Sequence, residues 1–395
     1  MENWKTYKLE DAIEKLIDYR GKTPKKTTHG VPLVTAKVIK GGRILEPNEF
    51  ISKEDYEPWM RRGIPEVGDV VLTTEAPLGE VAQIKSADIA LAQRVITLRG
   101  KVGVLHSGYL KYFLQSSIGQ SRLEARQSGT TVFGIKQTEL RKVEVDCPLY
   151  SEQQVIASIL SAIDDKIENN LAMNKTFEEM AMALYKHWFV NSDTILDNTL
   201  ADYVHLNPRL SIKKGEVATY VNMKALPTDG MSVSEVDRAV VKGGAKFQNG
   251  DTLLARITPC LENGKTAFVD FLEENEIGFG STEFLVLRPK KRISKYWVYC
   301  LSRDINLVNH AVSCMIGTSG RQRVQNDPFL QYELPKIDKN LMKEFEIKVE
   351  PWFKKVKTNT NENQTLTQLR DTLLPKLISG EVRIKEFEEK ITAAL

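Results

Sequence analysis

Two stretches of the chain carry the repeat of a long amphipathic helix, and both interrupt it at the same place. Apolar residues recur every 3.5 positions over 156–188 and again over 345–377, an offset of 345 − 156 = 189 positions. Near the middle of each stretch two asparagines occupy consecutive core positions, which are Asn170 and Asn174 in the first and Asn359 and Asn363 in the second. A buried asparagine costs stability but specifies register and partner. The matched positions therefore predict that the two helices pair with each other.

Charge favours an antiparallel pairing of these helices. Positions whose numbers sum to 533 then face each other, which joins the asparagines two by two and sets Ile163 against Arg370. Segment 151–190 has 3 Lys+Arg and 6 Asp+Glu, a net charge of −3, whereas segment 339–380 has 8 and 5, a net charge of +3. A parallel pair would also align the asparagines. We expect the antiparallel form, an internal coiled coil that relates two flanking modules by a pseudo-twofold axis.

The segments before the two helices also correspond to each other. Each contains a Gly-Asp turn leading into an apolar strand, a second strand, an aromatic amphipathic helix and a Gly-Thr stretch. These segments are 68–73, 93–99, 109–114 and 129–131 in the first copy, and 250–255, 282–288, 296–301 and 317–320 in the second. Short strands, few helices and long loops predict an α+β fold with an internal repeat.

The predicted organisation has four parts. A first module at 1–150 is followed by a first spacer helix at 151–190, a second module at 191–338, and a second spacer helix with a tail at 339–395. Ser151 and Gln154 have the spacing of a capping box, which predicts the start of the first spacer. The second spacer is expected to stop at Ser379, because Gly380 suits the position after a helix.

Composition describes an ordinary globular protein. The chain has 395 residues, 42% of them hydrophobic, and a net charge of only +3. No apolar stretch approaches the roughly 20 residues of a membrane helix, and the first residues lack the pattern of a signal peptide. Four scattered cysteines have no metal-ligand spacing and are interpreted as reduced thiols. We therefore expect a cytoplasmic protein without a metal.

Motifs that carry catalysis or bind cofactors are missing from the sequence. The Gly-Lys-Thr triplets at 21–23 and 264–266 lack the glycine that a phosphate loop requires five residues earlier. Residues 326–329 read Asn-Asp-Pro-Phe, which partly resembles a loop of some methyltransferases. Without a second proline or a cofactor-binding glycine motif, we interpret it as a turn into the last strand. We expect no catalytic residue and no cofactor.

Polar, basic loops remain as the candidate functional residues. Arginine, glutamine and asparagine can make bidentate contacts to base edges, while lysine and hydroxyl groups suit phosphates. The alternative interpretation is that these are ordinary solvated loops. The predicted DNA-binding residues are Arg20, Lys22, Lys25, Lys26, Arg94, Thr130, Thr131, Lys136, Gln137, Arg256, Arg321, Gln322, Arg323, Gln325 and Asn326.

At this point the sequence resembles the DNA-specificity subunits of type I restriction-modification systems. The resemblance rests on Ile-Asp-Tyr-Arg-Gly-Lys-Thr-Pro at 17–24, a Gly-Thr-Thr stretch at 129–131, Ser-Glu-Gln-Gln at 151–154 with Ile-Asp-Asp-Lys-Ile at 163–167, and Leu-Leu-Pro-Lys-Leu-Ile-Ser-Gly-Glu-Val at 373–382. These motifs extend over both modules and both spacers.

The resemblance implies a non-catalytic subunit with two target-recognition domains separated by two antiparallel helices. Each domain would read one half of a split, asymmetric DNA site, and the helices would set the gap and bind two methyltransferase subunits. Through these, the complex would engage restriction subunits. The second module departs from the pattern, because Val-His-Leu-Asn-Pro-Arg at 204–209 stands in place of the Asp-Tyr-Arg-Gly-Lys-Thr-Pro loop.

Two other functions are compatible with the sequence. One is a coiled-coil protein-interaction scaffold that reads no DNA, and the other is an enzyme of unfamiliar type. Within the favoured class, the sequence does not decide between a restricting system and one that only methylates. It also does not indicate the half-site sequences, because loop conformation decides which side chain meets which base.

Overall fold

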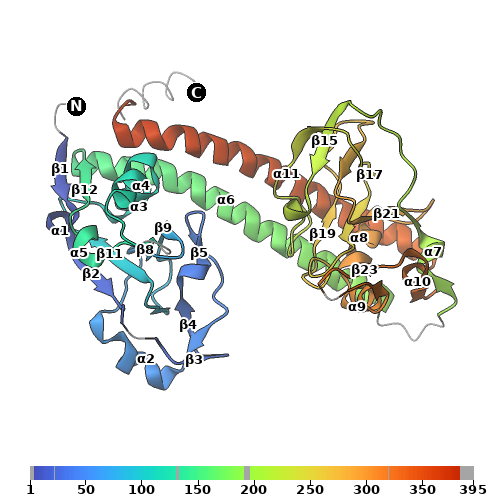
Figure 1. Cartoon of the computed structure of the whole chain (residues 1–395), viewed down its shortest axis with the longest axis horizontal. Helices are drawn as coiled ribbons and strands as arrows, with labels where there is room; N and C mark the ends of the chain where they lie inside the picture. The colour runs from blue at the N-terminus through green and yellow to red at the C-terminus, as the bar shows by residue number, and fades with distance from the viewer. Residues whose placement is uncertain (1–3, 22, 130–132, 191–195, 319, 383–395) are drawn as a thin grey trace. The chain divides into compact units, whose positions relative to one another are not determined.

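The computed structural model describes residues 4–382 except 22, 130–132, 191–195 and 319. The chain forms two compact units, one made of residues 1–166 with 365–395 and the other of residues 167–364 (Figure 1). Both long helices are divided between the units. The predicted α+β fold class is confirmed. No helix in the described ranges is long and apolar enough to cross a membrane.

Unit 1 contains two four-stranded sheets and two strand pairs. Their orders are β2-β11-β8-β9, β10-β4-β7-β3, β1-β12 and β5-β6. The elements are β1 (Lys5–Lys8), α1 (Leu9–Ala12), β2 (Ile13–Asp18), β3 (Lys26–Thr27), β4 (Val31–Val34), β5 (Ile39–Lys40), β6 (Arg43–Ile44), β7 (Phe50–Ile51), α2 (Lys53–Trp59), β8 (Val70–Thr74), β9 (Leu78–Gln83), β10 (Ala90–Leu91), β11 (Val95–Gly100), α3 (Ser107–Gln115), α4 (Ser117–Glu124), α5 (Gln137–Leu140) and β12 (Glu144–Cys147).

Unit 2 also contains two four-stranded sheets and two strand pairs. These are β14-β21-β18-β19, β16-β15-β20-β17, β13-β24 and β22-β23. The elements are β13 (Asn198–Thr199), α7 (Leu200–Tyr203), β14 (Val204–Leu206), β15 (Val217–Val221), β16 (Asp237–Val240), β17 (Ala245–Phe247), β18 (Thr252–Ala255), β19 (Thr266–Phe268), β20 (Gly278–Gly280), β21 (Phe284–Pro289), α8 (Lys295–Arg303), α9 (Ile305–Ser313), β22 (Met315–Ile316), β23 (Arg323–Val324), α10 (Asn326–Leu330) and β24 (Glu333–Leu334).

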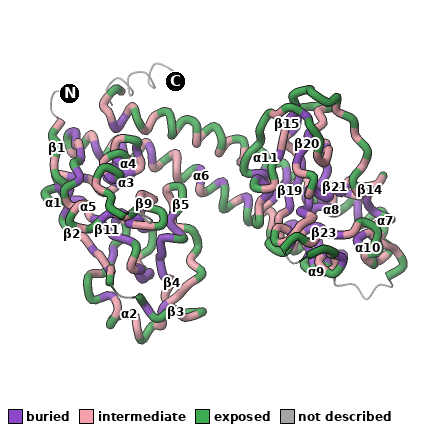
Figure 2. Tube along the Cα trace, in the orientation of Figure 1, coloured by how far each residue is buried: buried purple, intermediate pink, exposed green. Residues whose placement is uncertain are grey.

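The internal repeat predicted from the sequence is confirmed by strand order. The sheet β2-β11-β8-β9 has the same connectivity as β14-β21-β18-β19, and β1-β12 corresponds to β13-β24. In both copies a parallel pair joins the second sheet, β4 with β10 and β15 with β20. Buried strands and the aromatic helices α3 and α8 form the cores, visible as purple segments (Figure 2).

In each Gly-Asp turn a buried aspartate is held by a half-buried arginine. Gly68 and Gly250 have positive φ angles of 95° and 93°, which glycine adopts without strain. Asp69 then accepts hydrogen bonds from Arg99 at 2.7 and 2.9 Å, and Asp251 accepts two from Arg288 at 2.7 Å. These bidentate pairs tie the entrance of β8 to β11 and that of β18 to β21.

The long helices are α6 (Tyr150–Tyr185) and α11 (Lys339–Ser379). α11 ends where predicted, and Gly380 has a φ of 73°. At the start of α6 the predicted capping box is wrong, because Ser151 already lies inside the helix. The buried side chain of Gln153 anchors this end instead, accepting from the His106 amide at 2.8 Å and donating to the Pro148 carbonyl at 3.0 Å.

The predicted antiparallel register of the asparagines is confirmed within unit 2. Asn170 Nδ2 donates to Asn363 Oδ1 at 2.9 Å, and Asn359 Nδ2 donates to Asn174 Oδ1 at 2.8 Å. Asn170 also donates to Glu362 at 2.8 Å. Side-chain amides pair in this way only in one register, because a shift by one turn would bury them against apolar side chains.

In unit 1 the α6–α11 pair is held by an ionic cluster around Asp164. The carboxylate accepts from Lys111 Nζ and from the Tyr112 hydroxyl, both at 2.7 Å, and from Arg370 at 3.2 Å. Burial alone would raise the pKa of Asp164, but these donors bring it below its ordinary value. Arg370 thus contacts Asp164, and not Ile163 as the sequence alone suggested. Through Lys111 and Tyr112 the same carboxylate fastens α3 to both long helices.

We predict that Asn359→Ala lowers the free energy of unfolding by about 1–3 kcal/mol, because the buried Asn174 oxygen loses its donor. The double variant Asn174→Leu with Asn359→Leu is expected to recover that loss, since both polar groups are removed together. Urea unfolding measures both variants. A double variant less stable than the single one would contradict the assignment of this pair as a specificity device.

We also predict that Asp164→Asn lowers the free energy of unfolding by about 3 kcal/mol at pH 7, because Lys111 stays buried without its counter-charge. The folded-state pKa of Asp164 lies below the unfolded value, so its stabilisation is present above about pH 4 and is lost as pH falls through the folded pKa. The gap between wild type and variant, measured by urea unfolding from pH 7 to pH 3, should therefore narrow at the acid end.

The neighbouring Asp165 supplies the matched control. It pairs with Lys85 at 2.9 Å, but the two side chains are 58% and 61% exposed. Asp165→Asn should change the free energy of unfolding by less than about 1 kcal/mol. Equal losses in the two variants would show that burial does not set the strength of the Asp164 cluster.

Candidate nucleic-acid interface

The residues that flank the Gly-Thr stretches of both units lie against the end of the strand that follows the Gly-Asp turn. In unit 1, Gly134 exchanges backbone hydrogen bonds with Ser128, and the Ile135 amide donates to Thr74 at 3.0 Å. In unit 2, β22 and β23 form a hairpin, and the Val324 amide donates to Arg256 at 3.0 Å. Two of the predicted loops, 128–137 and 317–326, thus occupy equivalent places. Thr130 and Thr131 lie outside the described residues.

A guanidinium group caps the same backbone carbonyl in each unit. Arg20 Nη1 donates to the Ile135 carbonyl at 2.9 Å, and Arg256 Nε donates to the Val324 carbonyl at 3.0 Å. Positions 135 and 324 differ by 324 − 135 = 189, the offset of the helix repeat. The two arginines themselves are not equivalent, because Arg20 follows β2 whereas Arg256 follows β18. The second module lacks the loop that carries Arg20 in the first. Arg256, from the end of another strand, makes the equivalent contact there.

Arg20 is a half-buried structural residue as well as a candidate reader. Asp18 accepts from its Nε at 3.1 Å and from its backbone amide at 2.9 Å. Arg62 then donates to the carbonyls of Asp18 and Arg20, both at 2.8 Å. Arg62 was missed by the sequence analysis, and no local motif signals it, since it reaches this turn from 42 residues away.

Besides Arg20, which pairs with Asp18, three more of the predicted cations are paired with carboxylates. Arg94 contacts Glu75 at 2.8 Å and Lys26 contacts Glu49 at 2.8 Å. Arg323 forms a fork with Glu283, with contacts between 2.8 and 3.0 Å. Glu283 occupies the strand position that corresponds to Arg94, so the charge at this position has opposite sign in the two modules. The partners are not equivalent, because Glu75 bridges to Gly134 in unit 1 whereas Arg323 bridges to Ile257 in unit 2. A DNA phosphate would have to compete with these partners.

Other predicted residues lie at the surface. The side chains of Lys25, Lys136, Arg321 and Asn326 are exposed, and no hydrogen bond or ion pair is found for them among the described residues. Gln137 and Gln322 are half-buried, and Gln325 donates weakly to the Arg323 carbonyl at 3.4 Å. Lys25 and Lys26 are not on the sheet that carries the Gly-Thr segment, because Lys26 begins β3 in the other sheet. Lys22 lies outside the described residues.

The Asn-Asp-Pro-Phe segment is part of a helix and not the predicted turn. Residues Asn326–Leu330 form α10, which leads into β24 through Gln331 and Tyr332. The ring of Phe329 is fully buried. A phenylalanine in that position cannot stack on a nucleotide base, so the likeness to a methyltransferase loop has no structural counterpart.

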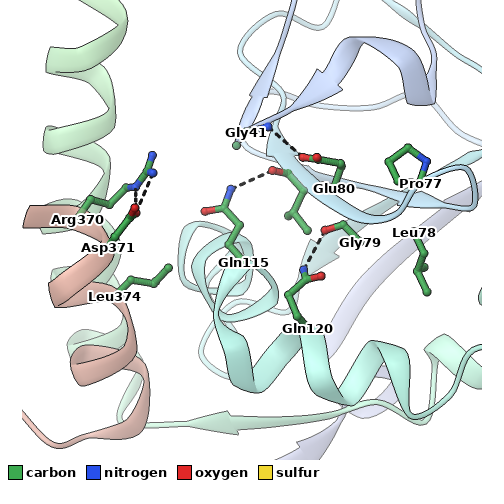
Figure 3. A pocket seen from close by; sticks show the side chains of 12 residues that line it. Gly41, Pro77, Leu78, Gly79, Glu80, Gln115, Gln120, Arg370, Asp371 and Leu374 are labelled. Atoms are coloured by element: carbon green, nitrogen blue, oxygen red, sulfur yellow. Dashed lines mark hydrogen bonds and ion pairs between the residues drawn. The ribbon is translucent and has the colours of Figure 1, made fainter. Parts of the chain in front are cut away.

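A polar pocket of about 360 Å³ in unit 1 lies between β9, the helices α3 and α4, and α11 (Figure 3). Its polar groups are engaged with one another. Gln115 donates to the Val81 carbonyl at 2.9 Å, Gln120 to the Gly79 carbonyl at 2.9 Å, and Arg370 to its neighbour Asp371 at 2.9 Å. With Glu80 and Asp371 against one arginine, this lining does not suit an anionic ligand.

A second pocket, of about 370 Å³, lies wholly in unit 2 and has the opposite character. Its lining includes the cations Arg209, Lys246 and Arg256 and contains no acidic residue. We refer to it as the cation pocket. Arg209 and Lys246 were absent from the predicted DNA-binding residues. Arg209 ends the segment 204–209 that departs from the family's loop pattern, and Lys246 lies in β17, outside the loops that the repeat aligns.

The sequence is similar to proteins of one kind. Residues 1–176 match the model of the type I restriction modification DNA specificity domain. Over 348 residues the chain is 27% identical to the type I restriction enzyme MjaIX specificity subunit of Methanocaldococcus jannaschii, an alignment that covers 81% of this chain and 79% of that protein. The chain is thus similar to type I restriction enzyme specificity subunits over most of its length, and residues 1–176 match their DNA specificity domain.

Two further comparisons give the same similarity. The EcoAI specificity subunit of Escherichia coli is 32% identical over 143 residues, 35% of this chain and 24% of that protein. The crystal structure of a type I restriction-modification S subunit from M. genitalium superposes with a TM-score of 0.58 at 17% identity, covering 95% of this chain and 96% of the other. The latter shows that the specificity-subunit fold extends over both modules and both helices.

Proposed function

We propose that this specificity subunit reads a bipartite, asymmetric DNA site. Residues 1–150 would act as the first target-recognition domain and residues 191–338 as the second. The observation that carries the proposal is that one strand scaffold occurs twice and has different side chains around the equivalent loop. Arg20 and Arg256 reach equivalent carbonyls from different strands, and Glu283, paired with Arg323, stands in the second module where Arg94, paired with Glu75, stands in the first. Two equivalent surfaces with unlike side chains suit two unlike half-sites.

The long helices supply the second half of the proposal. Their 36 and 41 residues correspond to lengths of about 54 and 62 Å, so they would act as a ruler between the half-sites. Leu171, Met180, Ile347 and Leu369 are apolar residues of these helices that are exposed by 41–61%. Such side chains suit the docking of two methyltransferase subunits, and through them of restriction subunits. The chain itself would contribute no catalytic group and no cofactor site.

The proposal is tested by producing the chain together with its methyltransferase subunits in a host and sequencing the host DNA for modified adenines. One split motif with a constant gap is the expected result. A stable complex that modifies no motif would instead favour the coiled-coil scaffold without DNA readout.

Within that experiment we predict that Arg321→Ala relaxes the motif at one position of one half-site, because the exposed guanidinium can make a bidentate contact to a base. Arg321→Lys keeps the charge but loses the fork, so it should relax the same position while preserving affinity. The cost of a lost bidentate contact is about 1–3 kcal/mol. An unchanged motif in both variants would remove Arg321 from the reading surface.

We further predict that deleting the facing heptads 165–171 and 362–368 shortens the gap by about three base pairs. Seven helical residues span about 10 Å, and one base pair about 3.4 Å. The deletion leaves Asp164 and Glu178 in place and rotates the helix by only about 20°. The Asn174→Leu, Asn359→Leu variant has full-length helices and should keep the original gap. Retention of the original gap after the deletion would contradict the ruler.

A further inference from the structure

We propose that the cation pocket of unit 2 binds one phosphodiester of the DNA backbone and so sets the register of the neighbouring hairpin on its half-site. The pocket is lined by Arg209, Lys246 and Arg256, and it is built by elements distant in sequence. This inference rests on the proposed function, because it supposes that the second module meets DNA. It joins Arg209 and Lys246, which were not predicted to bind DNA, to the predicted DNA-binding residue Arg256 in one site.

Two backbone features, at Asn207 and at Gly244, form the walls of the pocket. Asn207 turns the chain out of β14 with a φ of 49°, and its side chain accepts from the Val286 amide at 2.9 Å. Gly244 has a φ of 103°, and a Cβ there would lie 2.0 Å from the Gly280 carbonyl oxygen. Only glycine permits that approach. The approach sets the β17–β20 register, in which Lys246 lies opposite Phe279.

The positive charge of the pocket is not cancelled by an adjacent acid. Glu283 lies between the lining residues Thr282 and Phe284 on the chain, and both of its oxygens accept hydrogen bonds from Arg323. Arg323, one of the predicted DNA-binding residues, thus neutralises the carboxylate that is nearest along the chain to the lining of the pocket. Three cations therefore line the pocket without a carboxylate in the lining. Among the described residues no ion pair is found for Lys246, so an anionic ligand would supply its partner.

Arg256 connects the pocket to the reading hairpin. Its amide donates to the Glu283 carbonyl at 2.9 Å, its carbonyl accepts from the Val324 amide at 3.0 Å, and its Nε donates to the Val324 carbonyl at 3.0 Å. The guanidinium is held in place before any ligand binds. A phosphate on Arg256 would lie beside β23, and the attached nucleotide would lie next to the loop that carries Arg321.

A phosphate fits the lining better than a base does. Reading a flipped base requires an aromatic face and unoccupied amide or carboxylate groups. Phe284, the aromatic residue of the lining, is only 2% exposed, and the Asn207 carboxamide oxygen is already bonded to Val286. Guanidinium and ammonium groups are the usual partners of DNA phosphates, and such contacts position the protein without conveying sequence.

The test uses the complex of this chain with its methyltransferase subunits and a duplex that contains the methylated motif. Wild type and Arg209→Ala, Lys246→Ala are compared by equilibrium binding between 50 and 200 mM salt. Loss of one phosphate contact should weaken binding and reduce the slope of log K against log salt by about 1, while the methylated motif stays the same. Lys291→Ala, an exposed lysine beyond the other end of β21, should leave the slope unchanged.

A scan of single methylphosphonate substitutions locates the contact. One uncharged position in the second module's half-site should weaken wild-type binding and have no further effect on the double variant. A wild-type slope in the double variant, or the same scan profile in both proteins, overturns the pocket while DNA reading stands. A changed methylation motif also overturns it, because the pocket would then read a base. If the wild-type complex neither binds the duplex nor methylates a motif, the proposed function fails with it.

Discussion

The architecture of unit 1 depends on one carboxylate. Asp164 on α6 accepts from Lys111 and Tyr112 of α3 and from Arg370 of α11. It therefore fastens the core of the first module to both long helices at one point. Burying these charges is favourable only while all partners are present, so the cluster specifies one attachment geometry. The cluster thereby fixes the orientation of the first module on the helix segments of its own unit.

Unit 2 uses a comparable device built from different residues. Glu178 on α6 accepts from the Tyr299 hydroxyl and the Met231 amide, both at 3.0 Å, and burial raises its pKa. Arg303 next to it donates to the carbonyls of Thr228, Gly230, Gly264 and Thr266. Under the internal repeat, Asp164 on α6 corresponds to Phe353 on α11 (164 + 189 = 353). Glu178 lies on α6 and is therefore not the counterpart of Asp164 in the second copy. The duplicated scaffold preserves strand order, while the polar contacts that fasten it to the helices have diverged.

The candidate site was predicted unevenly, and the reason lies in the range of the interactions. The loops at 128–137 and 317–326 were found because the repeat aligns them, and in both units they lie at the end of equivalent strands. Which of their charges are available could not be predicted. Arg94 and Arg323 meet carboxylates 19 and 40 positions away along the chain, and Arg209 meets Lys246 at a pocket that exists only after β14 and β17 are placed.

The sequence by itself determined the duplication and the two long helices, and it favoured the antiparallel pairing that the asparagine contacts of the structure then decided. Heptad spacing, matched asparagines and Gly-Asp turns are local or periodic features, so one chain is enough to read them. The tertiary structure decided which side chains serve each surface: Gln153 instead of Ser151 at the start of α6, Arg256 in the place of Arg20, and Arg323 as the partner of Glu283. Polar contacts of this kind form between residues far apart in sequence, and their energy depends on burial and on distances that only the folded chain defines.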